Sequence, residues 1–170
     1  MPLHRNSVLP RNLAIASPMN LPSAAADHPK QQALLEAAEL AKSGCFIDAY
    51  QRLLACGSVN DWFGSERAEI AWIVSELGAP RLSRWHTLKG FREMPDSLAV
   101  RNAYGALIVA DNGPLDTLEF LESNVEPTEQ NSSDDRMRWH WLRASSLTQL
   151  RDFAAAEQEL DRMAAVGERV

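Results

Sequence analysis

The chain is 170 residues long, with a net charge of −6 and an apolar fraction of 45%, which suits one domain with a sizeable core. The acidic balance argues against nucleic acids and anionic membranes, both of which attract basic surfaces. Two cysteines form no disulfide framework and favour a reducing cytoplasm, and no apolar run approaches the ~20 residues that span a bilayer.

Residues 1–28 differ in composition from the remainder of the chain. Four prolines interrupt any helix there, at Pro2, Pro10, Pro18 and Pro22. The segment carries a net charge of +1, because Arg5 and Arg11 stand against Asp27. We therefore expect a disordered, proline-rich leader. A signal peptide is the less favoured alternative, since residues 23–26 resemble a cleavage site but the apolar stretch 13–16 is short.

Apolar periodicity and turn residues predict eight helices in the rest of the chain. They cover about residues 27–43, 46–56, 65–77, 80–91, 97–110, 114–126, 133–150 and 152–167. Pro80 and Pro114 suit helix starts, and glycine at position 113 follows Asp111 and Asn112 in a strong turn signal. Ser132 followed by Asp135 is similar to a capping box at the start of the seventh helix. Because no segment shows strand alternation, we expect an all-α fold.

One pattern recurs four times along these helices. The first helix of each pair contains an aligned small residue, with spacings of 34, 35 and 38 residues, at Ala37, Ala71, Ala106 and Ala144. Seven residues later comes the turn between the paired helices, at Gly44, Gly78, Gly113 and Arg151. Small side chains let antiparallel helices approach closely, and glycine readily takes the left-handed conformation that ends a helix. Because one pair cannot bury its own apolar face, neighbouring pairs must stack.

This layout resembles the tetratricopeptide repeat (TPR) family, whose unit is a helix-turn-helix of 34 residues. The resemblance covers residues 29–167, as repeats 30–63, 64–97, 98–132 and 133–167, and implies a right-handed α-solenoid of stacked antiparallel helix pairs. The third repeat is degenerate, because Leu118 and Glu122 replace a small and an aromatic residue. A phase shifted by one residue is the alternative alignment there. An unrelated helical bundle is the alternative for the whole chain.

In the TPR family the first helices of successive repeats line a concave groove. Carried over by position, the resemblance implies a partner-binding groove that contains Leu35, Glu69, Trp72, Tyr104, Leu107, Arg138 and Trp141. The wider set of groove positions is Leu34, Ala38, Ala41, Ala68, Ser75, Ala103, Ala110, Leu142, Ser145 and Thr148. Aromatic side chains on such a surface are typical binding anchors, so we expect Trp72, Tyr104 and Trp141 in one groove. Burial of these side chains in the core is the alternative.

Family members that clamp a C-terminal carboxylate use Lys, Asn and Arg in this groove. The corresponding positions here are occupied by Leu34, Ala38, Ala68, Trp72 and Ala103. The groove is therefore expected to accept an apolar or helical segment of a protein partner.

No residue spacing predicts catalytic or metal chemistry. The sequence has no His-x-x-x-His, paired-cysteine or Glu-x-x-His motif, so we expect no metal, cofactor or catalytic residue. A nucleophilic pair of Cys45 or Cys56 with His86 is disfavoured, because Cys56 suits a buried small residue and Cys45 adjoins a turn.

The sequence thus predicts a non-catalytic, cytoplasmic scaffold that binds a protein or peptide, with no nucleic-acid or membrane partner. Two alternatives remain open. One is a bacterial secretion-type chaperone for a partner protein, and the other is the N-terminal repeat segment of a larger enzyme, for example a papain-like peptidase with TPR repeats.

Overall fold

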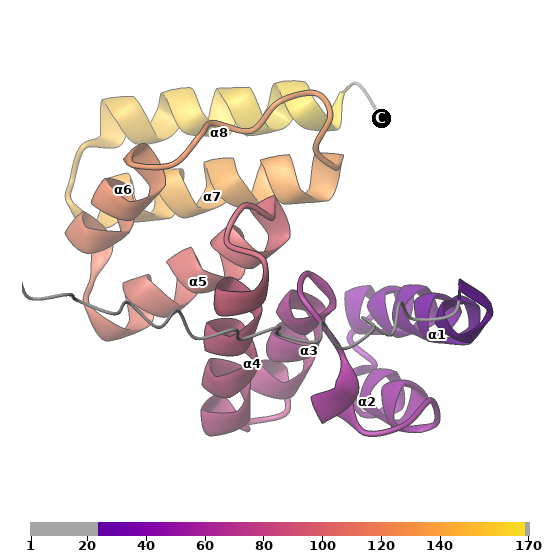
Figure 1. The fold of residues 1–170 in the computed structure, drawn as a ribbon. Coiled ribbons are helices and arrows are strands. Elements are labelled where there is room, and N and C mark those ends of the chain that lie inside the picture. The colour runs from indigo at the N-terminus through magenta and orange to yellow at the C-terminus, as the bar shows by residue number, and fades with distance from the viewer. Residues whose placement is uncertain (1–23, 169–170) are drawn as a thin grey trace, which may run out of the picture.

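The computed structural model describes residues 24–168, which form eight α-helices, one short 3-10 helix and no β-strand (Figure 1). The elements are α1 (Ala24–Lys42), α2 (Phe46–Leu54), η1 (Val59–Asp61), α3 (Glu66–Glu76), α4 (Pro80–Glu93), α5 (Leu98–Asp111), α6 (Pro114–Glu122), α7 (Ser133–Gln149) and α8 (Phe153–Gly167). The predicted all-α class is confirmed for this part of the chain. None of its helices combines the length and the apolar character needed to cross a lipid bilayer.

The first helix begins earlier than the sequence pattern predicts. It starts at Ala24, so residues 24–28 of the expected leader are helical, and Pro29 lies inside the helix rather than in its first turn. The alanines at positions 24–26 account for this extension, because alanine has the highest helix propensity. The rest of the expected leader, residues 1–23, lies outside the described residues, as do residues 169–170.

All four predicted turn residues between paired helices have a positive φ angle. The values are 79° at Gly44, 76° at Gly78, 104° at Gly113 and 65° at Arg151. Glycine adopts this conformation readily. Arg151 is the one non-glycine residue with a positive φ in the described part of the chain, and its Cβ makes that conformation unfavourable. The positions of the turns are confirmed.

Side-chain caps begin α7 and α8 close to where the sequence places them. Ser132 Oγ accepts the backbone N–H of Asp135 at 3.1 Å and donates its own proton to the Asp135 carboxylate at 2.7 Å. Asp152 Oδ1 accepts the N–H of Ala155 at 3.2 Å. The two backbone N–H groups that donate here, those of Asp135 and Ala155, are among the donors that the first helical turn leaves unpaired.

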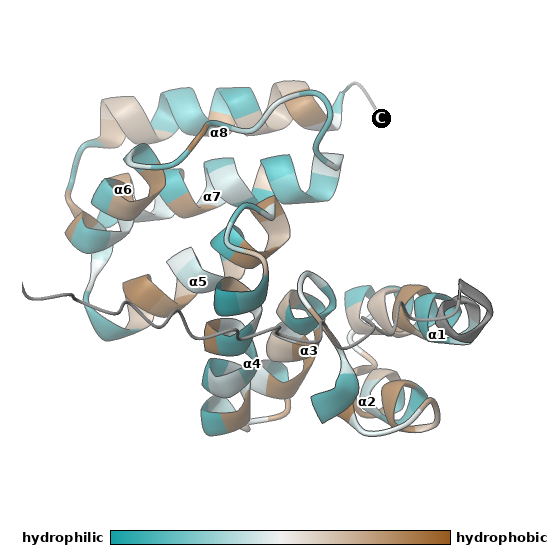
Figure 2. Ribbon diagram, in the orientation of Figure 1, coloured by the Kyte–Doolittle hydropathy of each residue, from teal (hydrophilic) through white to brown (hydrophobic). Residues whose placement is uncertain are grey.

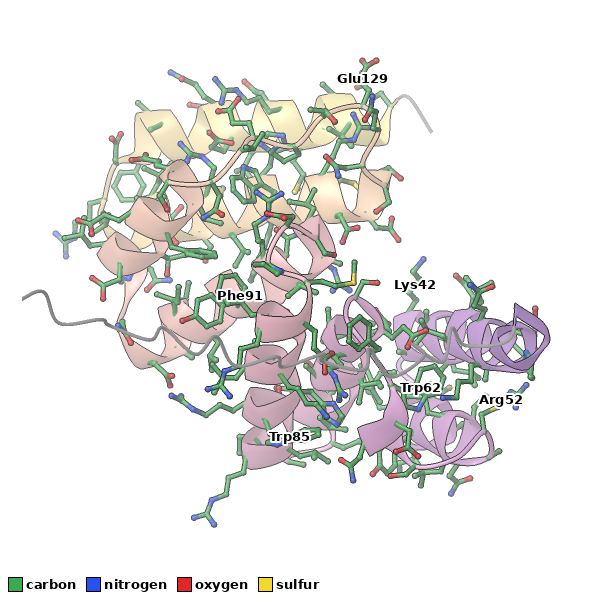
Figure 3. All side chains as sticks on the ribbon, viewed as in Figure 1. Lys42, Arg52, Trp62, Trp85, Phe91 and Glu129 are labelled. Carbon is green, nitrogen blue, oxygen red and sulfur yellow. The ribbon has the colours of Figure 1, made fainter. Side chains whose placement is uncertain are left out.

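Helices adjacent in sequence pack against one another along the described chain, and α1 also contacts α3, α3 contacts α5, and α5 contacts α7. In Figure 1, α7 and α8 run side by side, whereas α1 and α2 lie beyond α3 at the other end. Figure 2 shows hydrophilic and hydrophobic segments alternating along α7 and α8, as expected of helices with one buried face. Lys42 extends from α1 toward α7, where its Nζ lies 3.1 Å from Asp134 Oδ2 (Figure 3).

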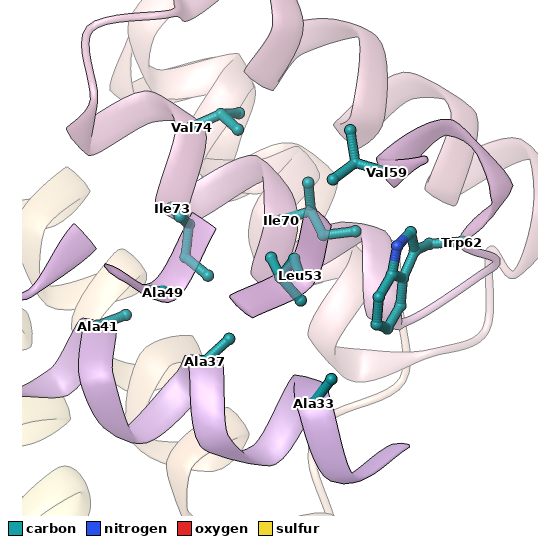
Figure 4. Close-up of a cluster of buried hydrophobic side chains, with 10 residues drawn as sticks. All are labelled: Ala33, Ala37, Ala41, Ala49, Leu53, Val59, Trp62, Ile70, Ile73 and Val74. Carbon is teal, nitrogen blue, oxygen red and sulfur yellow. The ribbon is translucent and has the colours of Figure 1, made fainter. Parts of the chain in front are cut away.

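One core cluster joins α1, α2, η1 and α3 (Figure 4). Its α1 side consists of Ala33, Ala37 and Ala41, which recur every four residues and therefore share one face of the helix. These short side chains pack against larger ones from the other helices, including Leu53 and Ile73 (Figure 4). The close approach of α1 to its neighbours thus depends on three alanines, of which the repeat pattern singles out Ala37, whereas Ala41 is buried here and not in a groove as expected.

The third repeat is shifted by one residue relative to the alignment on alanines. The other three aligned alanines are buried, namely Ala37, Ala71 and Ala144. Ala106 is exposed, and its neighbour Gly105 is buried instead. A Cβ atom added at Gly105 would lie 3.4 Å from Leu142 Cδ1 and 3.5 Å from Leu121 Cδ2, which is ordinary van der Waals contact, so this position packs directly against both leucines. The burial of Gly105 and the exposure of Ala106 agree with the alternative alignment, which is shifted by one residue.

A buried ion-pair network fixes the linker before α3. Arg67 is 2% exposed, and its guanidinium donates to Glu93 Oε2 at 2.8 Å and to the Asn60 carbonyl at 3.1 Å. The same carboxylate oxygen accepts the N–H of Gly64 at 2.8 Å. Arg67 Nη1 lies 3.3 Å from His86 Nδ1, which must accept because arginine only donates. Burial, reinforced by the Arg67 charge, lowers the pKa of His86 to about 4, so this imidazole is neutral at pH 7.

A second buried carboxylate joins α7 to α8. Glu159 accepts a hydrogen bond from His140 Nδ1 at 2.8 Å and another from Arg143 Nε at 3.0 Å. Burial by itself would raise the pKa of Glu159, but these hydrogen bonds outweigh it and hold the pKa below its usual value. The last helix pair therefore has polar as well as apolar contacts between its members.

Candidate functional site

A groove of about 750 Å³ lies between α3, α4, α5 and α7, and we call it the central groove. Much of its lining is alanine from α3 and α5, at Ala68, Ala71, Ala103, Ala106 and Ala110. Short side chains leave the space between the helices unfilled. The large apolar residues of the lining are Trp72, Leu107, Trp141 and Leu142. The groove is thus mainly apolar, as binding sites commonly are.

Four of the seven groove residues expected from the sequence line the central groove, namely Trp72, Leu107, Arg138 and Trp141. From the wider set, five more line it, namely Ala68, Ser75, Ala103, Ala110 and Leu142. The structure places Leu35, Glu69 and Tyr104 elsewhere. Five residues of the wider set do not line the groove, namely Leu34, Ala38, Ala41, Ser145 and Thr148.

Trp141 is the exposed aromatic residue of the central groove. Its side chain is 55% exposed, whereas Trp139, two residues earlier on α7, is 1% exposed and belongs to the core cluster with Leu98 and Leu121. Residues two positions apart point to different sides of a helix. An exposed indole in an apolar groove is a candidate contact for a ligand.

Trp72 is both a core residue and a groove residue. It is half-buried against the first core cluster and meets the ring of Phe46 edge to face, with ring centroids 5.6 Å apart. The guanidinium carbon of Arg138 lies 5.0 Å from its ring centroid, within the range of a cation–π contact. Trp72 therefore connects the packing of α3 with the exposed face of α7.

Tyr104 lies on the other side of α5, packed among aromatic rings. It stacks on Phe91 at 4.2 Å with an interplanar angle of 11°, and it meets Phe120 at 5.2 Å. The one-residue phase shift at Gly105 explains this position, because it rotates each side chain of α5 by about 100° relative to the expected alignment. Tyr104 borders a separate cavity of about 470 Å³ between α4, α5 and α6.

Leu35 and Glu69 do not line the central groove. Leu35 is 64% exposed on α1, a helix that contributes no residue to the groove lining. Glu69 is half-buried on α3, and its Oε1 has no hydrogen-bond partner within residues 24–168. Burial raises the pKa of Glu69, while the charges of Arg138 and Lys42 act in the opposite direction.

Sequence reasoning missed the contributions of α4 and of Asn102. Helix α4 adds Arg81 and Arg84 to the groove lining, and no local pattern indicates this because the expected groove contained first helices only. Asn102 is buried on α5 and its Nδ2 donates to the carbonyl of Asp135 at 2.8 Å, which fixes α7 across α5. The alternative phase of the third repeat would have placed Asn102 at a groove position.

The contacts of the two cysteines do not include His86. Cys56 Sγ lies 3.7 Å from the carbonyl oxygen of Pro29 and 3.8 Å from Arg52 Nη1, and Cys45 is exposed. His86 is buried against Arg67. Among residues 24–168, no three His, Cys, Asp or Glu side chains are grouped so that they could hold a metal ion.

Comparisons with protein-family models, with curated protein sequences and with solved structures give no match to this chain.

Proposed function

We propose that this chain is a non-catalytic TPR-like scaffold that binds a segment of a partner protein in the central groove. The proposal includes a right-handed solenoid of four helix pairs. It is supported by contacts between alternate helices as well as adjacent ones, and by two consecutive spacings of 34 residues once Gly105 replaces Ala106 in the alignment with Ala37 and Ala71.

The observation that carries the proposal is the position of Trp141. A large indole, 55% exposed, stands in a mainly apolar groove whose lining includes five alanines and two leucines. Exposure of such an apolar surface to water is unfavourable, and a bound ligand would remove it from water. Tryptophan is also enriched among the residues that dominate binding energy at protein interfaces.

An apolar or helical segment is the occupant that best suits this lining. Short alanine side chains on α3 and α5 leave room for the side chains of an inserted segment, while Trp72 and Trp141 supply large surfaces for contact. A net charge of −6 does not favour nucleic acid as the ligand. We place the protein in the cytoplasm, where its two free cysteines would stay reduced.

A pull-down from the cells that express the protein tests the proposal. We compare the wild type with Trp141→Ala and with Phe153→Ala, a control that removes an aromatic ring of similar exposure (63%) from α8, outside the groove. Circular dichroism checks that all three proteins fold. A partner retained by the wild type and the control but lost by folded Trp141→Ala supports groove binding. Equal retention by all three proteins would refute it.

A further inference from the structure

The central groove is locally basic, although the chain is acidic overall. Three arginines line it, Arg81, Arg84 and Arg138, against two carboxylates, Glu76 and Asp111. Arg84 and Asp111 pair with each other. The whole chain, by contrast, carries a net charge of −6. The lining of this groove is therefore opposite in sign to the net charge of the chain.

Arg138 has the geometry of an unused anion-binding group. It is exposed, and its guanidinium is held 5.0 Å from the Trp72 ring centroid. Within residues 24–168 no carboxylate lies at ion-pair distance from it. Contact with the aromatic ring limits the freedom of this side chain but leaves N–H donors at the edge of the guanidinium. Binding a carboxylate then costs less side-chain conformational entropy than it would for a freely moving arginine.

The acidic groups around the start of α7 do not neutralise Arg138 by direct pairing. Asp134 pairs with Lys42, and Asp135 accepts the hydroxyl proton of Ser132. Burial raises the pKa of Glu69 and the Arg138 charge opposes this, but Glu69 and Arg138 do not form an ion pair. The guanidinium N–H groups of Arg138 therefore have no direct carboxylate partner among residues 24–168.

Trp141 follows Arg138 by three residues on α7, so the two side chains lie about one turn apart on the same face of the helix. The groove thus presents a cation beside a large apolar surface. Resting on the proposed function, we infer that the bound segment of the partner carries a carboxylate next to a large apolar side chain. The carboxylate binds Arg138 and the apolar side chain covers Trp141.

The same charges argue against the N-terminal segment of this chain as the occupant. Residues 1–23 contain Arg5 and Arg11 and no Asp or Glu. Such a segment would bring positive charge to Arg138 and supply no carboxylate.

The inference is tested with three matched sets of short capped peptides. Each set has a phenylalanine, and one helical turn away from it a glutamate, a glutamine or a lysine. Binding is followed through the indole N–H signals of the five tryptophans, with that of Trp141 assigned from Trp141→Ala. We expect the Trp141 signal to shift with the glutamate set at roughly tenfold lower concentration than with the lysine set, as a charge-assisted hydrogen bond would produce. Attraction by the net charge alone would favour lysine.

Charge-changing variants separate this contact from general electrostatics. Arg138→Gln should remove the preference for glutamate, and Arg138→Glu should reverse it in favour of lysine. Arg92→Gln and Arg92→Glu make the same charge changes at an exposed residue outside the groove and should leave the preference intact. Circular dichroism checks that each variant folds, and if Arg138→Glu does not, Arg138→Gln alone decides.

The peptide experiment separates a wrong acidic preference from a groove that binds no peptide. If all three sets shift Trp141 at equal concentrations, the groove binds peptides but the acidic preference is wrong. A preference that persists in Arg138→Gln also overturns the inference. If no set shifts Trp141, the inference falls, and the pull-down with Trp141→Ala decides whether the proposed function falls with it.

Discussion

Trp139 and Trp141 lie two residues apart on α7, yet Trp139 is 1% exposed in the core and Trp141 is 55% exposed in the central groove. Neighbouring positions on one helix thus place one indole in the core and the other in the groove, where the proposed function assigns it to the ligand. Trp139 packs with Leu98 and Leu121 from the preceding helix pair, whereas Trp141 faces a space lined by alanines.

Replacing these two tryptophans should have opposite consequences for stability. Trp139→Ala removes a fully buried aromatic ring and should lower the free energy of unfolding by about 3–5 kcal/mol. Trp141→Ala should change it by no more than about 0.5 kcal/mol, as is usual for surface substitutions. Urea denaturation followed by circular dichroism measures both values. A large loss for Trp141→Ala would show that this indole is part of the core.

A substitution of Trp72 cannot separate ligand binding from stability. It is half-buried against Phe46 and the first core cluster, so Trp72→Ala would lower stability and partner affinity together.

Arg151→Gly should stabilise the last helix pair. Arg151 has a φ of 65°, a conformation that glycine occupies readily and an L side chain does not. We expect a net gain of about 0.5–1 kcal/mol, after allowing for the greater freedom of glycine in the unfolded chain. The matched control is Gly78→Ala, with φ 76°, which should lose a similar amount. Thermal unfolding of both variants checks the signs, and a destabilised Arg151→Gly would contradict the turn geometry.

The two arginine ion pairs of α3 and α4 should differ widely in their contribution to stability. Arg67→Ala removes the buried guanidinium from the partly buried Glu93 carboxylate, which keeps only the Gly64 N–H and the more distant Lys89, and should cost about 3–5 kcal/mol. Arg84→Ala breaks an exposed pair with Asp111 and should cost less than about 1 kcal/mol. Chemical denaturation of the two variants compares them directly. Similar costs would mean that the Arg67 network is open to water.

His86 should make the fold sensitive to mild acid. Its pKa is about 4 in the folded chain and near 6.5 when unfolded, so the unfolded state binds a proton first as the pH falls. Stability from this group is complete above pH 6.5 and should decline by on the order of 3 kcal/mol by pH 4. His86→Gln keeps an acceptor for Arg67 but does not titrate. The unfolding free energy of the wild type minus that of the variant should therefore fall between pH 6.5 and pH 4. A difference that stays constant would exclude this role for His86.

The sequence predicted the parts of the fold that depend on local chemistry. Turn residues and a capping serine act within a few residues, so the four turns and the cap of α7 could be located without a structure. Three of the four aligned alanines, Ala37, Ala71 and Ala144, are buried as expected for closely packed helices.

Features that depend on contacts between repeats were harder to predict. Gly105 and Ala106 are adjacent small residues, and only the contacts with Leu121 and Leu142 decide which one is buried. Because Gly105 is buried and Ala106 is exposed, Tyr104 lies outside the central groove. The arginines of α4 reach the groove through the packing of α4 against α3 and α5, which no single-helix pattern encodes.

The most direct test of the account is the affinity of an identified partner for the wild type and for Trp141→Ala, measured by isothermal titration calorimetry with Phe153→Ala as the control. If Trp141 anchors the partner in the central groove, the dissociation constant of Trp141→Ala should rise by about 30-fold, which corresponds to an interface hot spot of about 2 kcal/mol. Phe153→Ala should bind as the wild type does. An unchanged dissociation constant for folded Trp141→Ala would contradict the account, because the partner would then bind outside the groove.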